Sequence, residues 1–188
     1  MKGHKAQVKD FGMKYAGILD HLNKAFLTKY DDVTVVETSL LIVTVISYIV
    51  PKRFELLAPL NTMLEENLDG LIQSDIVVRC RVAMLYGYYA DSVLKENEAR
   101  FKQILTFLFE SLGMRGENKA IAIQACDTLC TVVCDQDIVP RIEGIIDSLL
   151  PIVNEFAISV EMELFFDFLG ELTRIYKDVI GSEVLGVL

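Results

Sequence analysis

The chain has 188 residues, 52% of them hydrophobic, and a formal net charge of -9. An acidic chain lacks the clustered lysine and arginine that phosphate groups require, so direct binding to nucleic acid is not expected. Glycine and proline are few and scattered, which predicts one continuous domain over residues 1–188 without a flexible linker.

The first expected helix covers residues 5–29, where apolar side chains recur at helical spacing. Its apolar stripe comprises Val8, Phe11, Tyr15, Ile18, Leu19, Leu22 and Phe26. Asp32 is the expected N-cap of a second helix that runs to about residue 50, where Pro51 ends it. Residues 33–50 are apolar apart from Glu37 and several Ser and Thr. A membrane span is one interpretation, but these polar side chains favour a helix buried in protein, with no membrane insertion.

The middle of the chain predicts three further helices. One covers residues 53–72, with Pro59 in its first turns. The next is an inner, buried helix that begins after Ser74 as N-cap and runs to Asp91. After a polar break comes an amphipathic partner, apolar at positions 101, 104, 105, 108 and 109 and followed by Gly113 at a C-cap position.

The last third of the chain continues in the same way. Residues 118–134 predict a helix that is apolar at positions 121, 125, 129, 132 and 133. A partner is expected over 141–156, with Pro140 before it and Pro151 bending it, and a final helix over 159–177. Because the pattern begins and ends within a unit, without polar capping repeats, we expect a fragment of a longer chain.

A segment of this pattern repeats at a separation of 43 or 44 residues. Leu85, Leu129 and Leu172 each stand six residues before an Asp, and they are 44 and then 43 positions apart. Counting 44 back from Leu85 gives Leu41, inside the apolar run of the second expected helix. A helix pair at this period is typical of HEAT and armadillo arrays.

The partner helices repeat as well, because each begins with a basic residue before an apolar one, at Arg53, Arg100 and Arg141. The sequence therefore predicts an all-α fold, a HEAT-repeat α-solenoid of about four antiparallel helix pairs in a right-handed superhelix. The expected units cover residues 31–73, 74–113 and 117–157, with partial units over 1–30 and 159–188.

Three cysteines, Cys126, Cys130 and Cys134, share one face of an expected helix. A thiolate metal site is conceivable, yet there is no C-x-x-C pair and neither histidine is near in sequence. We favour small buried helix residues, with no metal or other cofactor, and a reducing compartment because no disulfide framework is implied.

No motif for nucleotide binding, zinc hydrolysis or a nucleophilic serine occurs. Enzyme activity is therefore not expected. A solenoid instead presents a concave surface lined by the second helix of each pair. The exposed candidates there, apart from Lys102, are acidic: Glu66, Asp69, Glu110, Glu143, Asp147 and Glu155. They form either a binding track for a basic protein partner or an ordinary solubilising surface.

Three stretches resemble the middle to C-terminal HEAT repeats of the importin-beta superfamily (karyopherins). They are VRCRVAMLYGYYA at 78–90, IQACDTL at 123–129, and residues 138–178 with LLPIVNE at 149–155. The similarity covers about residues 38–180 and is greatest to the large importins that carry ribosomal proteins and histones, and to their export relatives. The chain departs from these receptors at Met84-Leu85-Tyr86, where they often have a tryptophan-containing core.

The resemblance implies a segment of a nuclear transport receptor that carries protein cargo through nuclear pores under Ran-GTP control. Such a receptor shuttles between cytoplasm and nucleus. It binds cargo on its concave face, Ran-GTP mainly through its N-terminal repeats, and phenylalanine-glycine nucleoporins between its outer helices. The alternative is a HEAT-repeat scaffold or adaptor in a stable multi-subunit complex.

Overall fold

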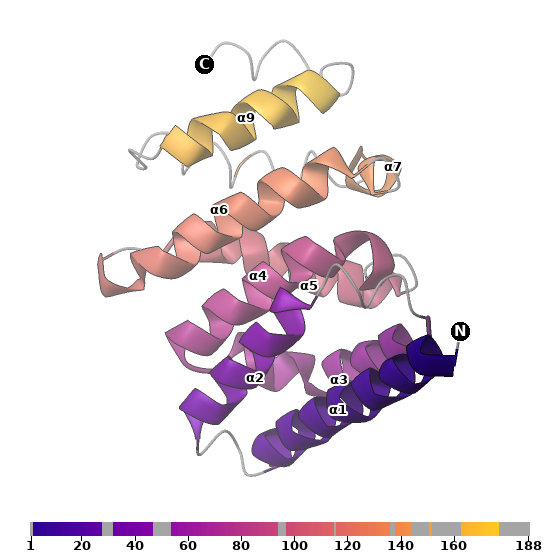
Figure 1. Cartoon of the computed structure of the whole chain (residues 1–188). Coiled ribbons are helices and arrows are strands. Elements are labelled where there is room, and N and C mark those ends of the chain that lie inside the picture. The colour runs from indigo at the N-terminus through magenta and orange to yellow at the C-terminus, as the bar shows by residue number, and fades with distance from the viewer. Residues whose placement is uncertain are drawn as a thin grey trace. The chain divides into compact units, whose positions relative to one another are not determined.

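The computed structural model describes residues 2–27, 32–46, 54–93, 97–114, 116–135, 138–143, 151 and 163–176. Within these ranges the regular structure consists of eight α-helices and one 3₁₀ turn, with no strand (Figure 1). The prediction of an all-α fold is confirmed. The chain divides into two compact units, Met1–Ser92 and Val93–Leu188, so the boundary falls inside the expected repeat at 74–113.

The first unit contains α1 (Lys2–Leu27), α2 (Val33–Val45), α3 (Phe54–Ile72) and α4 (Ile76–Val93). Helix α1 packs against both α2 and α3 (Figure 1). The expected stripe of α1 faces this core, because Tyr15, Leu19 and Leu22 are buried. The side chains of Val8 and Phe26 lie outside the described part of the chain.

Helix α2 begins where the sequence predicts, because the Asp32 carboxylate accepts a hydrogen bond of 3.1 Å from the Val35 N–H. Its described part ends at Val45, and the expected extension through residues 47–50 lies outside the described ranges. No helix among the described residues is both long and apolar enough to cross a membrane.

The predicted N-cap of α4 was wrong by one residue. Asp75, not Ser74, caps the helix, since its Oδ1 accepts 2.9 Å from the Val77 N–H and its carbonyl accepts from the Arg79 N–H. The Ser74 N–H instead donates back to the Leu71 carbonyl, at the end of α3. A carboxylate at the cap also favours the positive end of the helix dipole, which a serine hydroxyl does less well.

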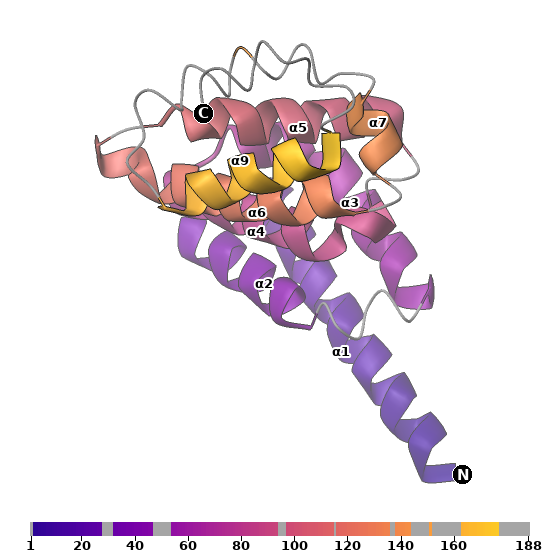
Figure 2. The ribbon, with the colours of Figure 1, turned by 90° about the horizontal axis from the view of Figure 1, so that it is seen from above.

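The second unit contains α5 (Glu98–Leu112), a 3₁₀ turn (Gly116–Asn118), α6 (Lys119–Cys134), α7 (Val139–Glu143) and α9 (Glu163–Tyr176). Helix α6 packs against α5 and α9, and α9 overlies α6 in both views (Figures 1 and 2). The apolar positions predicted for the helices over 98–112 and 118–134 are all buried.

Helix α5 starts at Asn97, whose side chain accepts from the Arg100 N–H at 3.1 Å. Gly113 is its C-cap as predicted, but in a right-handed conformation, and the positive φ of 60° belongs to Gly116. Of the partner helix predicted over 141–156, the described part ends at Glu143; residues 144–150 and 152–162 lie outside the described ranges.

Candidate protein-binding surface

Side-chain contacts inside the first unit join residues separated by about one predicted repeat. Asn67 on α3 donates through Nδ2 to the Asn23 side chain on α1 at 3.3 Å, across 44 residues. Arg81 on α4 forms an ion pair with Glu37 on α2, also across 44 residues. The Glu37–Arg81 pair explains why an acidic residue stands in an otherwise apolar segment, since a half-buried carboxylate needs a cationic partner.

Two tyrosines make the same contact in the two units. The Tyr89 hydroxyl on α4 donates to the Val43 carbonyl on α2 at 2.9 Å, 46 residues away. The Tyr176 hydroxyl on α9 donates to the Val133 carbonyl on α6 at 3.3 Å, 43 residues away. Both carbonyls lie in the last turn of the described helix, where the intrahelical hydrogen-bond ladder ends. Each tyrosine therefore satisfies the C-terminus of the helix that precedes it by one repeat.

A fifth contact of this spacing lies in the second unit. Arg141 on α7 donates through Nη2 and Nε to one oxygen of Glu98 on α5, at 2.8 and 3.2 Å and 43 residues away. Its guanidinium also lies 3.8 Å from the centre of the Phe101 ring. Arg141 is one of the basic residues that open the predicted second helices, and its role is to hold α7 on α5.

Three of the predicted binding residues have described side chains. Glu66 and Asp69 are exposed on α3, and Glu110 is exposed on α5. Glu143 is the last residue of α7, and its side chain is outside the described part of the structure. Asp147 and Glu155 both lie outside the described ranges. The binding role of all six stays a prediction, and among the described side chains Glu66 and Asp69 lie about one turn apart on α3.

Asp69 and Glu110 share an unfavourable position. Each lies in the last turn of its helix, where no basic residue occurs. The carbonyl end of a helix favours cations, so an exposed carboxylate there costs about 0.3–1 kcal/mol at low salt. Because stability alone would not favour acidic residues at these two helix ends, their charge is consistent with a binding role.

The helices expected to be inner and buried carry exposed apolar side chains that the sequence analysis does not predict. Helix α4 buries Val78, Val82 and Tyr89 but leaves Val77 and Tyr88 exposed by 46% and 56%. The composition of α4 is apolar on all sides, so helical periodicity could not separate the buried face from the exposed one.

Two pairs of exposed apolar residues are each separated by one repeat. In the first unit, Val45 on α2 is exposed by 62% and stands 43 positions before Tyr88 on α4. In the second unit, Ile123 on α6 and Phe166 on α9 are exposed by 43% and 58% and are again 43 positions apart. The two pairs occupy different places in the repeat, because the residue 43 positions after Tyr88 is Thr131, so the repeat alone does not predict which positions are exposed.

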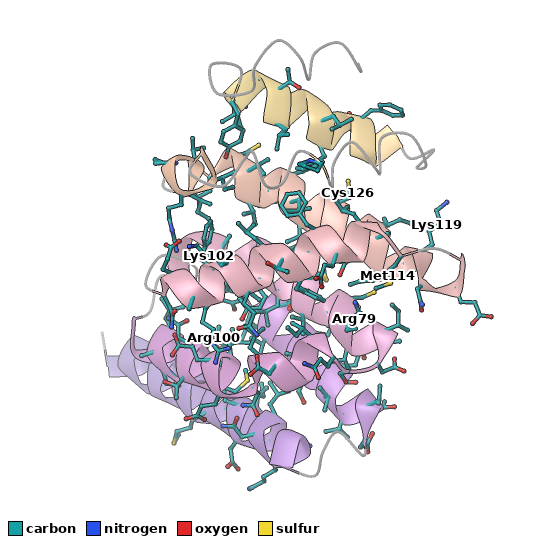
Figure 3. All side chains as sticks on the ribbon, turned by 180° about the vertical axis from the view of Figure 1, so that it is seen from behind. Arg79, Arg100, Lys102, Met114, Lys119 and Cys126 are labelled. Carbon is teal, nitrogen blue, oxygen red and sulfur yellow. The ribbon has the colours of Figure 1, made fainter. Side chains whose placement is uncertain are left out.

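The cysteine prediction holds for one thiol only. Cys126 is buried, as predicted, but Cys130 is half-buried and Cys134 is exposed. Figure 3 shows Cys126 on α6. The reason for the gradient is that each four-residue step turns the helix about 40° past a full circle, so the stripe rotates toward solvent.

The thiols differ in acidity as well. A hydrogen bond to Cys130 and burial raise the pKa of Cys126, whereas the same hydrogen bond lowers the pKa of Cys130. Burial and the hydrogen bond to Glu171, 3.4 Å from its sulfur, raise the pKa of Cys134. Within the described ranges, no three His, Cys, Asp or Glu side chains are grouped so that they could hold a metal ion.

Comparison with known proteins adds no relative. No protein-family model matches the chain, and neither a curated protein nor a solved structure matches it.

Proposed function

We propose that the chain is a protein-binding HEAT-repeat segment of an importin-beta-like nuclear transport receptor. The observation that carries the proposal is the set of contacts between residues 43 to 46 apart, which occurs within both units. This spacing agrees with the 43–44-residue period of the sequence, as stacked helix pairs of one solenoid require.

In this proposal the second helices of the pairs receive cargo. Helices α3, α5 and α7 occupy that position in the repeat frame, and α3 carries Glu65, Glu66 and Asp69 but no lysine or arginine. An acidic helix surface attracts basic proteins and speeds their association. Histones and ribosomal proteins, the cargo of the receptors that the sequence resembles, have this character.

The first helices then face the nuclear pore. Phenylalanine-glycine segments need small apolar sites between neighbouring outer helices, and an exposed pair such as Val45 and Tyr88 supplies apolar area on α2 and α4. Weak binding suits this role, because a receptor that crosses a pore must release each site quickly. The receptor would shuttle between cytoplasm and nucleus.

The test is a pull-down from cell extract with the full-length protein that contains these residues, with and without Ran locked in its GTP state. The proposal expects Ran-GTP to change the captured set, with release of basic cargo for an importer and capture for an exporter. A set of stoichiometric partners that Ran-GTP leaves unchanged would reject the transport role and favour the scaffold alternative.

A further inference from the structure

The α6–α9 face of the second unit combines apolar and acidic side chains. The two helices run in the same direction. Asp167, near the start of α9, interacts electrostatically with Cys126 and Cys130, whereas Tyr176, at the end of α9, donates a hydrogen bond to Val133 at the end of α6. Ile123 on α6 and Phe166 on α9 are exposed by 43% and 58%. These two side chains leave large apolar area in water on adjacent helices.

A carboxylate accompanies each of these apolar residues. Asp127 lies one helical turn after Ile123, and Asp167 follows Phe166 directly; both are exposed. The pKa of the buried Cys126 thiol is raised mainly by its hydrogen bond to Cys130 and by burial, and both carboxylates add a smaller electrostatic contribution. Because both Asp127 and Asp167 interact electrostatically with Cys126, their negative charges lie near the same part of the contact between α6 and α9.

Among the described residues, the nearby cations do not cancel this charge. Arg174 donates through Nε to Glu171 at 3.0 Å, so these two neutralise each other. Lys119, the first residue of α6, points away from the unit (Figure 3). The α6–α9 face thus keeps a negative potential beside its apolar side chains.

Gly170 leaves open space on the same helix. A Cβ built at this position meets no atom within 4 Å, and Gly170 is exposed one turn after Phe166. A partner side chain can therefore approach the α9 backbone closely there, and a larger residue can be introduced without a clash in the fold.

We infer that the α6–α9 face binds a basic amphipathic helix of a partner protein. Its apolar side chains would contact Ile123 and Phe166, and its lysine or arginine side chains would lie against Asp127 and Asp167. The charge selects this partner over an uncharged apolar segment. In the first unit, by contrast, the carboxylate of Glu37 on α2 is neutralised by Arg81 on α4. This site is separate from the acidic second helices proposed to receive cargo.

The test measures fluorescence anisotropy of a labelled helical peptide of about 18 residues, built from leucine and lysine, in about 0.1 M salt. Phe166→Ala and the double variant Asp127→Asn/Asp167→Asn are each expected to weaken binding about tenfold. Gly170→Arg is expected to abolish it by filling the open space and adding a positive charge.

Two controls keep the test specific. Gly17→Arg adds the same residue on α1, where a Cβ also meets no atom within 4 Å, and Tyr88→Ala removes an exposed aromatic residue from the first unit. Both should bind the peptide like the unchanged protein. The inference is overturned if the lysine peptide does not bind, if a glutamate version binds as well, or if Gly17→Arg weakens binding as much as Gly170→Arg. A cargo defect in the second-helix variants alone would leave this result untouched.

Discussion

Replacing Tyr176 by Phe removes only the hydroxyl that donates to the Val133 carbonyl at the end of α6. The ring stays, and it is 1% exposed, so packing against its neighbours is retained. The Val133 carbonyl, in the last turn of α6, then loses this donor. A net hydrogen bond contributes about 0.5–1.5 kcal/mol, and leaving a buried carbonyl unsatisfied costs about 1–3 kcal/mol. We expect Tyr176→Phe to destabilise its unit by about 1–2 kcal/mol.

Tyr89→Phe should cost a similar amount in the first unit, because its hydroxyl makes the equivalent bond to Val43 at 2.9 Å. Burial raises the pKa of Tyr89, so the hydroxyl remains protonated and able to donate throughout the neutral range. The assay is urea unfolding followed by circular dichroism, with calorimetry as a second probe. For a chain of this size each kcal/mol lowers the melting temperature by roughly 2–4 °C.

Tyr88 supplies the matched control. It is the neighbour of Tyr89 and is 56% exposed, so Tyr88→Phe should change stability by less than about 0.5 kcal/mol. The reasoning would be refuted if Tyr89→Phe and Tyr88→Phe had equal effects, or if Tyr176→Phe left the unfolding midpoint unchanged.

Three further outcomes follow from single contacts. Glu110→Gln removes a charge from the carbonyl end of α5 and should stabilise the chain by about 0.3–0.5 kcal/mol in urea unfolding; a loss of stability would contradict the helix-dipole argument. Asp75→Ala should lower the free energy of unfolding by about 1 kcal/mol in the same assay, and Ser74→Ala by much less, because Asp75 caps α4. A larger loss for Ser74→Ala than for Asp75→Ala would show that Ser74 is the cap. Alkylation with iodoacetamide, read by mass spectrometry, should modify Cys134 well before the buried Cys126. The alkylation rate at Cys134 should reach half its maximum above pH 9.0, because the pKa of this thiol is raised above that ordinary value; a midpoint at or below pH 9.0 would contradict the raised pKa.

The helices themselves could be predicted because their apolar residues alternate with polar ones at helical spacing. In α5, Phe101, Ile104 and Leu108 lie on one stripe, and the structure buries all three. The cap of α4 could not be placed, because Ser74 and Asp75 are adjacent and both are good N-cap residues. Only the actual path of the chain decides between them.

The contacts between helices were within reach of the sequence, although periodicity within a helix does not reveal them. Tyr89 and Tyr176 occupy the same place in the repeat, four residues after Leu85 and Leu172. A tyrosine at the same position of two repeats indicates that its hydroxyl makes the same interhelical hydrogen bond in both. The exposure of Phe166 had no such signal, since a phenylalanine in an amphipathic helix is normally assigned to the core.

Histone binding tests the proposed role of the acidic second helices in binding basic proteins. The double variant Glu66→Gln/Asp69→Asn should bind histone about tenfold more weakly than the unchanged chain, with a smaller loss of affinity as salt is added. The control Asp10→Asn/Asp20→Asn removes two charges from α1, each in an ion pair with a lysine one turn away. It should bind nearly as well as the unchanged chain. Equal binding by the unchanged chain and the Glu66/Asp69 variant would contradict the account.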